Sequence, residues 1–264
     1  MASATLEHWV DGLQASGRYT FLRTEAIHAT GASPNAIKKS LSRLMHRGRV
    51  VKVKDYFFVV VPLEYQSAGS PPVSWYIHDL MAAMGRPYYV GLLSAAGLHG
   101  ASHQQPQEFQ VVTDRYIRPM SAGRTRIRFF TSKYIVDAAC VNMKTPTGSM
   151  RVSTPETTAV DLVRFAKSAG HLDHVSTVLA ELASSTDPKK LVAAARRVDD
   201  VPNIQRLGFI LDQVHPRKLT GPLHEWVMRQ QPRPTPLRSG RPIADAREDR
   251  RWRIFVNEHL EVEA

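Results

Sequence analysis

The first third of the chain carries apolar residues at helical spacing in two successive short segments. The first predicts a helix over residues 5–16, ended by Gly17, and the second predicts a helix over residues 23–29, followed by a tight turn at Gly31. The apolar residues expected to be buried here are Leu6, Trp9, Val10, Leu13, Leu22, Ala26 and Ile27. Each helix therefore presents one apolar face to a shared core.

A third helix and a hairpin follow. Ser33 is a good N-cap, Pro34 suits the first helical position because its missing N–H costs nothing there, and Gly48 is a C-terminal stop. The apolar positions of this helix are Ile37, Leu41, Leu44 and Met45. Two β-rich runs then turn near Lys54, which predicts a hairpin. This order of elements predicts a winged helix-turn-helix over residues 1–65.

Residues 66–74 are rich in Gly, Pro and Ser, which predicts a linker before a larger domain over residues 75–264. The pattern there predicts helices over residues 75–81, 88–100, 155–167, 171–184, 188–198, 201–214 and 221–229. It predicts a small antiparallel sheet over residues 108–113, 124–131, 137–143 and 148–153, and a final strand pair over 252–263. Four prolines make residues 230–242 irregular. The predicted fold class is α+β.

The net charge of the chain indicates which class of partner it binds. The 264 residues include 35 basic and 24 acidic side chains, and the formal net charge of +11 favours a polyanion. Cys140 is the only cysteine, which excludes an internal disulfide and a Cys-based zinc site. Residues 1–14 carry two acids and lack the apolar stretch of a signal peptide, and no run approaches the roughly 18 residues of a membrane span. We therefore expect a cytoplasmic protein without a membrane partner.

The basic run from Lys38 to Lys54 contains seven Lys or Arg residues and no acid. In a winged helix-turn-helix, the third helix lies in the major groove of double-stranded DNA. The wing is then placed for an adjacent phosphate or the minor groove. The expected DNA-binding residues are Ser33, Asn35, Lys38, Lys39, Ser42, Arg43, Arg47, Arg49, Lys52 and Lys54. The alternative is a solvated basic face on a module that contacts protein.

The sequence lacks the enzyme motifs that its charge could accompany. It has no phosphate-binding GxxxxGK[ST] loop, no GxSxG elbow and no nucleotidyltransferase pattern. His171 and His174 are spaced i, i+3 but lack a convincing third metal ligand. A nuclease-like enzyme is disfavoured because paired carboxylate–Lys motifs are missing. We therefore expect no catalytic residue, no cofactor, no metal site and no enzymatic activity.

Several other positions have both structural and functional interpretations. Residues 154–156 (Thr-Pro-Glu) are typical of a helix start. Arg206 and Gly208 favour either a close helix contact or an anion site. Residues 115–118 add positive charge, and a predicted strand carries alternating arginines at Arg124, Arg126 and Arg128. This arginine face could extend a nucleic-acid surface, contact tRNA or a protein partner, or simply be solvated.

Three segments together resemble the AbiEi family of antitoxins. They are residues 88–113 with LeuHisGly, residues 152–163 with ProGluThr, and residues 203–214 with ArgLeuGly. The resemblance follows the family order along nearly the whole chain. It implies a DNA-binding winged helix-turn-helix followed by an antitoxin domain.

The same resemblance implies a role in a bicistronic toxin–antitoxin system that gives abortive infection against phage. Such proteins repress their own operon by binding inverted repeats at the promoter. The implied functional partner is a nucleotidyltransferase-like AbiEii toxin, which type IV antitoxins counteract without a stable complex. The alternative is an interaction protein that neutralises its toxin by direct binding, with DNA binding secondary.

Overall fold

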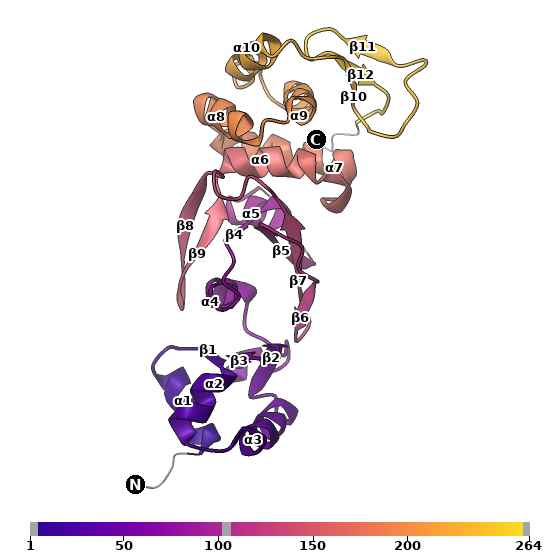
Figure 1. Cartoon of the computed structure of the whole chain (residues 1–264). Coiled ribbons are helices and arrows are strands. Elements are labelled where there is room, and N and C mark those ends of the chain that lie inside the picture. The colour runs from indigo at the N-terminus through magenta and orange to yellow at the C-terminus, as the bar shows by residue number, and fades with distance from the viewer. Residues whose placement is uncertain (1–4, 102–106, 261–264) are drawn as a thin grey trace. The chain divides into compact units, whose positions relative to one another are not determined.

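A computed structural model describes residues 5–101 and 107–260 of the chain. The chain is divided into two compact units, each built from three segments. Unit one comprises residues 1–88, 107–131 and 142–151, and unit two comprises residues 89–106, 132–141 and 152–264. Both units contain helices and strands, so the predicted α+β fold class is confirmed (Figure 1).

The N-terminal part of unit one has the arrangement of a winged helix-turn-helix module (Figure 1). Its elements are α1 (Leu6–Ala15), β1 (Thr20–Leu22), α2 (Arg23–Thr30), α3 (Pro34–His46), β2 (Val50–Lys54) and β3 (Phe57–Val60). The strands form an antiparallel sheet in the order β1-β3-β2. The three helices and the hairpin expected from the apolar pattern are confirmed, and β1 is an additional strand.

Local chemistry sets the ends of α3. The Ser33 hydroxyl accepts a hydrogen bond from the Ala36 N–H at 3.3 Å, and Pro34 occupies the first helical position. Gly48 has φ +67°, a left-handed conformation that glycine adopts without a Cβ clash. One face of α3 is buried through Ile37 and Leu41, which join a core shared with α1, α2 and the sheet. Burying this face fixes the direction of the opposite face.

The remainder of unit one adds α4 (Ile77–Ala83) and the strands β5 (Glu108–Thr113), β6 (Met120–Ala122) and β7 (Thr125–Thr131). The Thr20 hydroxyl donates to Asp79 of α4 at 2.6 Å, which ties α4 to the N-terminal sheet. The backbone N–H of Arg124 donates to the Ala68 carbonyl at 2.9 Å. Residues 66–74 therefore contact the turn between β6 and β7, and a domain boundary at this segment stays a prediction.

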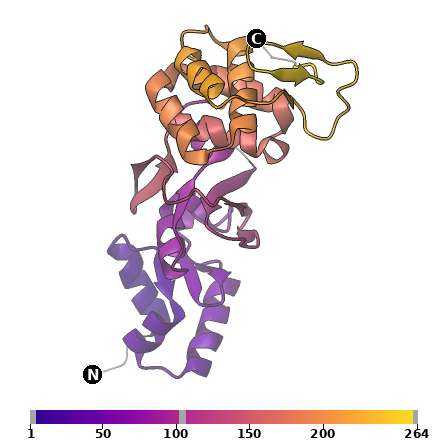
Figure 2. The same cartoon turned by 45° about the horizontal axis from the view of Figure 1, so that its top comes forward.

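Unit two contains a cluster of five longer helices (Figures 1 and 2). They are α6 (Pro155–Arg164), α7 (His171–Leu182), α8 (Pro188–Val198), α9 (Val201–Val214) and α10 (Gly221–Arg229). The helix start predicted at residues 154–156 is confirmed, because the Thr154 hydroxyl accepts from the Thr157 N–H at 3.4 Å. Glu156 is buried and accepts from the Asp187 N–H at 3.0 Å, which connects α6 to the start of α8.

A small C-terminal sheet packs on α9. Its strands β10 (Thr235–Pro236), β12 (Ile254–Val256) and β11 (Arg247–Asp249) lie in that order. Asp212 of α9 accepts from the indole N–H of Trp252 and from Arg251 Nε, both at 2.7 Å. Gly208 lies against the Trp252 ring, where an added Cβ would come within 2.2 Å. The glycine is therefore required by close packing.

The prediction of a single helix over residues 88–100 is wrong, because this segment forms a strand and a shorter helix. Tyr88–Val90 form the strand β4, and α5 spans Leu92–Leu98. All three strand residues are buried and are aromatic or β-branched, types that favour strands. Gly91 separates the two elements with an extended backbone, φ −133° and ψ −172°. A continuous apolar run hides such a change of secondary structure, because a buried strand and a buried helix share that pattern.

The predicted sheet also differs in its pairing. β5 and β7 are parallel over six residue pairs, and Val90 of β4 pairs in parallel with Val152 of β9 (Gly148–Ser153), so the sheet is mixed rather than antiparallel. β8 begins at Cys140 (Cys140–Thr145), three residues after the expected start. Residues 252–260 contain one strand, not two, because β12 finds its partners in β10 and β11; residues 261–263 lie outside the described residues.

Short 3-10 turns connect several elements, at Leu63–Tyr65, Val73–Trp75, Ala166–Ser168 and Ala183–Ser185. Among residues 5–101 and 107–260, no helix has the length and apolar character needed to cross a bilayer.

Candidate nucleic-acid interface

The helix α3 separates its apolar and basic side chains onto opposite faces. Ile37, Leu41 and Leu44 are at most 3% exposed, and Met45 packs partly buried against the same core. The outward face carries the exposed side chains of Lys38, Lys39, Ser42 and Arg43. Ser33 and Asn35 are exposed at its N-terminal tip. These six predicted residues therefore share one solvent-facing region of α3.

The charges of the two lysines of α3 are not neutralised by ion pairs within the described part of the chain. Neither Lys38 nor Lys39 has an acidic partner in the described part of the chain. Arg43 donates to the Ser40 hydroxyl at 3.1 Å, a neutral partner that leaves its charge uncompensated. A cationic helix face with these properties attracts phosphate groups, and its side chains are long enough to reach into a groove.

The arginines after α3 have a different environment. Arg47 pairs with Glu7 at 3.2 Å, and Arg49 pairs with Asp11, so both contact acids of α1. Exposed ion pairs of this kind stabilise little, about 0–1 kcal/mol. They nevertheless lower the net charge at the C-terminal end of α3. The sequence pattern did not predict these two ion pairs, because the acids lie about forty positions before their arginine partners in the chain.

The wing carries Lys52 and Lys54. Lys52 is exposed and pairs with Asp55 at 3.1 Å, and its hydrogen bond holds the pKa of Asp55 below the ordinary value. The ammonium of Lys54 lies 5.5 Å from the centre of the Tyr56 ring, a cation–π contact. Both lysines line a groove of about 570 Å³.

The other side of this groove comes from later parts of unit one. It is lined by Arg86, Arg115 and Arg118, with Tyr116 between them and 74% exposed. Asp114 pairs with Arg86 at 3.4 Å and with Arg115 at 3.7 Å. Residues 115–118 were marked by their charge in the sequence, but their position beside the wing depends on long-range folding. No local signal identifies Arg86.

The arginine face of β7 is partly neutralised. Arg126 and Arg128 pair with Glu108 on the neighbouring strand β5, at 3.1 and 3.4 Å. The parallel register places Glu108 directly opposite Arg126. Arg124 is exposed at the turn before β7. One carboxylate thus serves two of the three arginines, which weakens this strand as a phosphate-binding surface.

The ArgLeuGly segment of α9 has a structural role. Arg206 donates to the Pro236 carbonyl at 2.9 Å, to Asn203 at 3.1 Å, and to the hydroxyls of Thr235 and Ser239 at 3.2 and 3.1 Å. Burial lowers the pKa of this guanidinium. The hydrogen bonds hold β10 against α9.

Comparison with known proteins identifies the second part of the chain. Residues 89–213 match the family described as AbiEi antitoxin C-terminal domain. No curated protein matches the sequence. The crystal structure of the RV2827C protein from Mycobacterium tuberculosis has a similar fold, with a TM-score of 0.66 and 13% sequence identity over 94% of this chain and 89% of that one. At this identity the likeness concerns the fold alone. The match to the AbiEi antitoxin C-terminal domain thus covers residues 89–213, and the rest of the chain lies outside it.

Proposed function

We propose that this protein is the antitoxin of a bicistronic toxin–antitoxin system and represses its own operon by binding inverted repeats at the promoter. The antitoxin role follows from the AbiEi domain at residues 89–213. The observation that carries the DNA-binding role is the outward face of α3, where Lys38 and Lys39 are exposed and free of acidic partners among the described residues. The wing lysines and the adjacent basic groove support the same role.

In this proposal α3 enters the major groove and reads base edges through Ser33 and Asn35 at its N-terminal end and through Ser42 further along the helix. Lys38, Lys39 and Arg43 contact phosphates on either side of the groove. Arg47 and Arg49 contact the phosphate backbone of the DNA only if they give up their ion pairs with Glu7 and Asp11 of α1. Lys52 and Lys54 contact the next phosphates along the duplex.

The functional partner in this proposal is a nucleotidyltransferase-like AbiEii toxin, counteracted in the cytoplasm without a stable complex. The competing proposal is direct capture of the toxin by the winged-helix module. Both use the same exposed residues, and co-purification distinguishes them. A stable stoichiometric complex would support direct capture.

DNA binding is tested by replacing Lys38 and Lys39 together with alanine. Because both side chains are exposed, folding should be unaffected, and affinity for the promoter repeats should fall at least about tenfold. For a dimer with some 6 to 10 phosphate contacts, we expect a log K against log salt slope of about −5 to −9. In the variant its magnitude should fall by about 4, because each of the two protomers loses two phosphate contacts.

The matched control is Lys189→Ala with Lys190→Ala. These adjacent, exposed lysines near the start of α8 give the same change in net charge. Gel shifts over a salt series should show wild-type affinity for this control. Equal weakening in both double variants would indicate general charge attraction, and unchanged affinity in Lys38→Ala with Lys39→Ala would remove α3 from the interface.

Toxin rescue is measured with the same full-length variants. The Lys38→Ala, Lys39→Ala variant should relieve toxicity as wild type does when both are expressed from an unrelated promoter. Loss of rescue without loss of protein would place toxin neutralisation on α3 and favour direct capture.

A further inference from the structure

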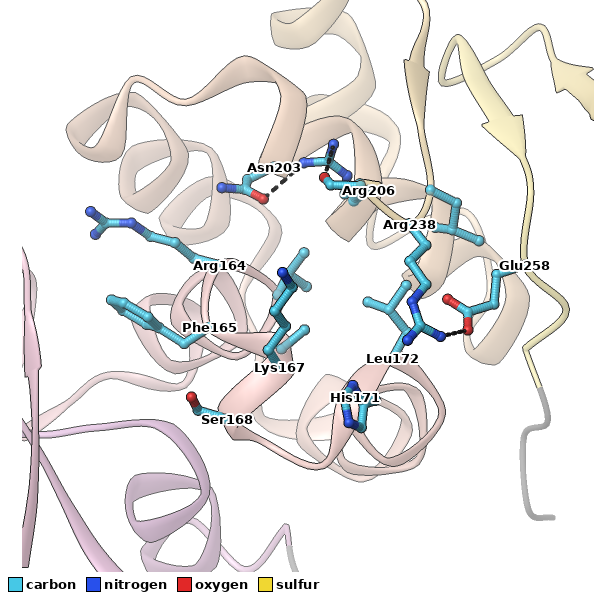
Figure 3. A pocket seen from close by; sticks show the side chains of 14 residues that line it. Arg164, Phe165, Lys167, Ser168, His171, Leu172, Asn203, Arg206, Arg238 and Glu258 are labelled. Carbon is cyan, nitrogen blue, oxygen red and sulfur yellow. Dashed lines mark hydrogen bonds and ion pairs between the residues drawn. The ribbon is translucent and has the colours of Figure 1, made fainter. Parts of the chain in front are cut away.

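Unit two contains a cavity of about 300 Å³ outside the winged-helix module (Figure 3). It lies between the C-terminal end of α6, the start of α7, the first turns of α9 and the segment after β10. Its walls combine apolar side chains from Val163, Leu172 and Leu237 with a concentration of basic groups. This mixture is typical of small-ligand sites, in which an apolar wall provides contact and a few polar groups orient the ligand.

Two side chains in the cavity are free to bind a ligand, the ammonium of Lys167 and the imidazole of His171. Lys167 and His171 are exposed, project into the open space in Figure 3, and have no acidic partner among the described residues. Arg206 is fixed in the wall by its four hydrogen bonds. Arg164 is directed away, where it donates to Ser132 at 2.9 Å and stacks on Tyr134. Lys167 and His171 are therefore the groups available to an anion.

The backbone at this point supports the same chemistry. His171 has φ +68°, an uncommon value for a residue with a Cβ, and it follows Gly170 at φ +85°. The twelve-residue helix α7 begins here, and Gly170 supplies no side-chain cap to its first N–H groups. Strained residues of this kind cluster at ligand sites, and a helix N-terminus adds positive potential.

A carboxylate at the far side of the cavity lacks a partner for one oxygen. The Glu258 side chain is 9% exposed, and its Oε1 pairs with Arg238 and, at 3.5 Å, with Arg241. Its Oε2 is buried and has no hydrogen-bond partner among the described residues. An unsatisfied buried acceptor destabilises the protein, and a ligand that donates an O–H or N–H would satisfy it.

We propose that this cavity binds a small phosphorylated ligand with hydroxyl or amino donors, of the class of nucleoside monophosphates. The phosphate lies at Lys167, His171 and the first N–H groups of α7. A hydroxyl or amino group of the nucleoside donates to Glu258 Oε2, and the apolar wall contacts the base or sugar. A volume near 300 Å³ is at the small end for ligand sites and fits one nucleotide.

The test is calorimetric titration of the full-length protein with adenosine monophosphate, inorganic phosphate and adenosine at constant ionic strength. Adenosine monophosphate should bind more tightly than the other two. Lys167→Ala should weaken it at least about tenfold, whereas Lys190→Ala, an exposed lysine on α8, should leave it unchanged. Glu258→Leu, which removes both acceptor oxygens, should bring adenosine monophosphate down to the affinity of phosphate.

Absence of binding by adenosine monophosphate, or equal weakening by Lys167→Ala and Lys190→Ala, would overturn the site. Phosphate binding as tight as adenosine monophosphate in the wild type would overturn the nucleoside part of the proposal. Lys167 is exposed, so its variant is expected to fold, and its thermal unfolding is recorded as a check. DNA binding plays no part in this site, and neither result bears on the proposed repressor role.

Discussion

Replacing Asp161 with asparagine is expected to stabilise the protein at neutral pH and to flatten its stability profile in acid. Asp161 lies on α6, is 1% exposed, and accepts a hydrogen bond from Tyr89 Oη at 2.8 Å. Burial raises its pKa from 3.8 to about 6, although the Tyr89 hydrogen bond and the Arg164 charge act in the opposite direction. Desolvation of the ionised carboxylate therefore dominates.

The direction in which stability changes with pH follows from proton linkage. Between pH 3.8 and about 6, the folded state holds a proton at Asp161 that the unfolded state has lost. This contribution to stability is fully present below pH 3.8 and is lost as the pH rises through about 6. One pKa unit corresponds to about 1.4 kcal/mol, so the loss is about 3 kcal/mol by pH 7. The asparagine variant lacks this loss, and its amide oxygen still accepts from Tyr89.

The assay is urea unfolding of the wild type and of Asp161→Asn at intervals from pH 4 to pH 8. The stability difference in favour of asparagine should grow by about 2.4 kcal/mol between pH 4 and pH 7 and then stay level, because at pH 4 the unfolded state has already lost part of its proton. Asp137→Asn, at an exposed position of the same unit, is the control and should follow the wild-type profile. A difference that does not change with pH would refute the argument that burial controls the ionisation of Asp161.

Two further predictions concern packing and capping in unit two. Gly208→Ala should destabilise the protein by about 1–3 kcal/mol in thermal unfolding, because the added Cβ would meet the Trp252 ring at 2.2 Å. Gly12→Ala, which has open space around the added Cβ, should not destabilise it, and equal effects of the two substitutions would contradict the packing argument. Thr154→Ala should lower the free energy of unfolding in urea by about 1 kcal/mol, because it removes the N-cap of α6, and Thr154→Ser should keep the wild-type stability. An alanine variant as stable as the wild type would show that the cap contributes nothing.

Helices are the elements that the sequence predicted best, because their signals are local. The spacing of Leu191, Ala194 and Ala195 and a cap at Asp187 define α8 within eleven residues, and the predicted range 188–198 matches Pro188–Val198. The same holds for α9 and α10. Caps and apolar spacing depend only on neighbours a few positions away, so they can be recognised without knowing the rest of the fold.

Strand pairing could not be predicted in the same way. The strand β5 reads as a strand from its own residues, but its parallel partner β7 is chosen by the path of the intervening chain. β4 is too short to interrupt an apolar run visibly. The wing groove has the same limitation, since Arg86 and Arg118 reach Lys52 only through tertiary structure. Pairing and clefts are decided by long-range contacts, about which periodicity carries no information.

The structure also changes what the net charge implies. A charge of +11 suggests that every basic side chain near the wing serves a polyanion. Arg47, Arg49 and Arg126 nevertheless have acidic partners within the chain, and a phosphate must compete with those carboxylates. Lys38 and Lys39 face no such competition among the described residues. Since counterion release rewards each newly neutralised phosphate, unpaired cations contribute most, and these two lysines rather than the total charge should determine affinity.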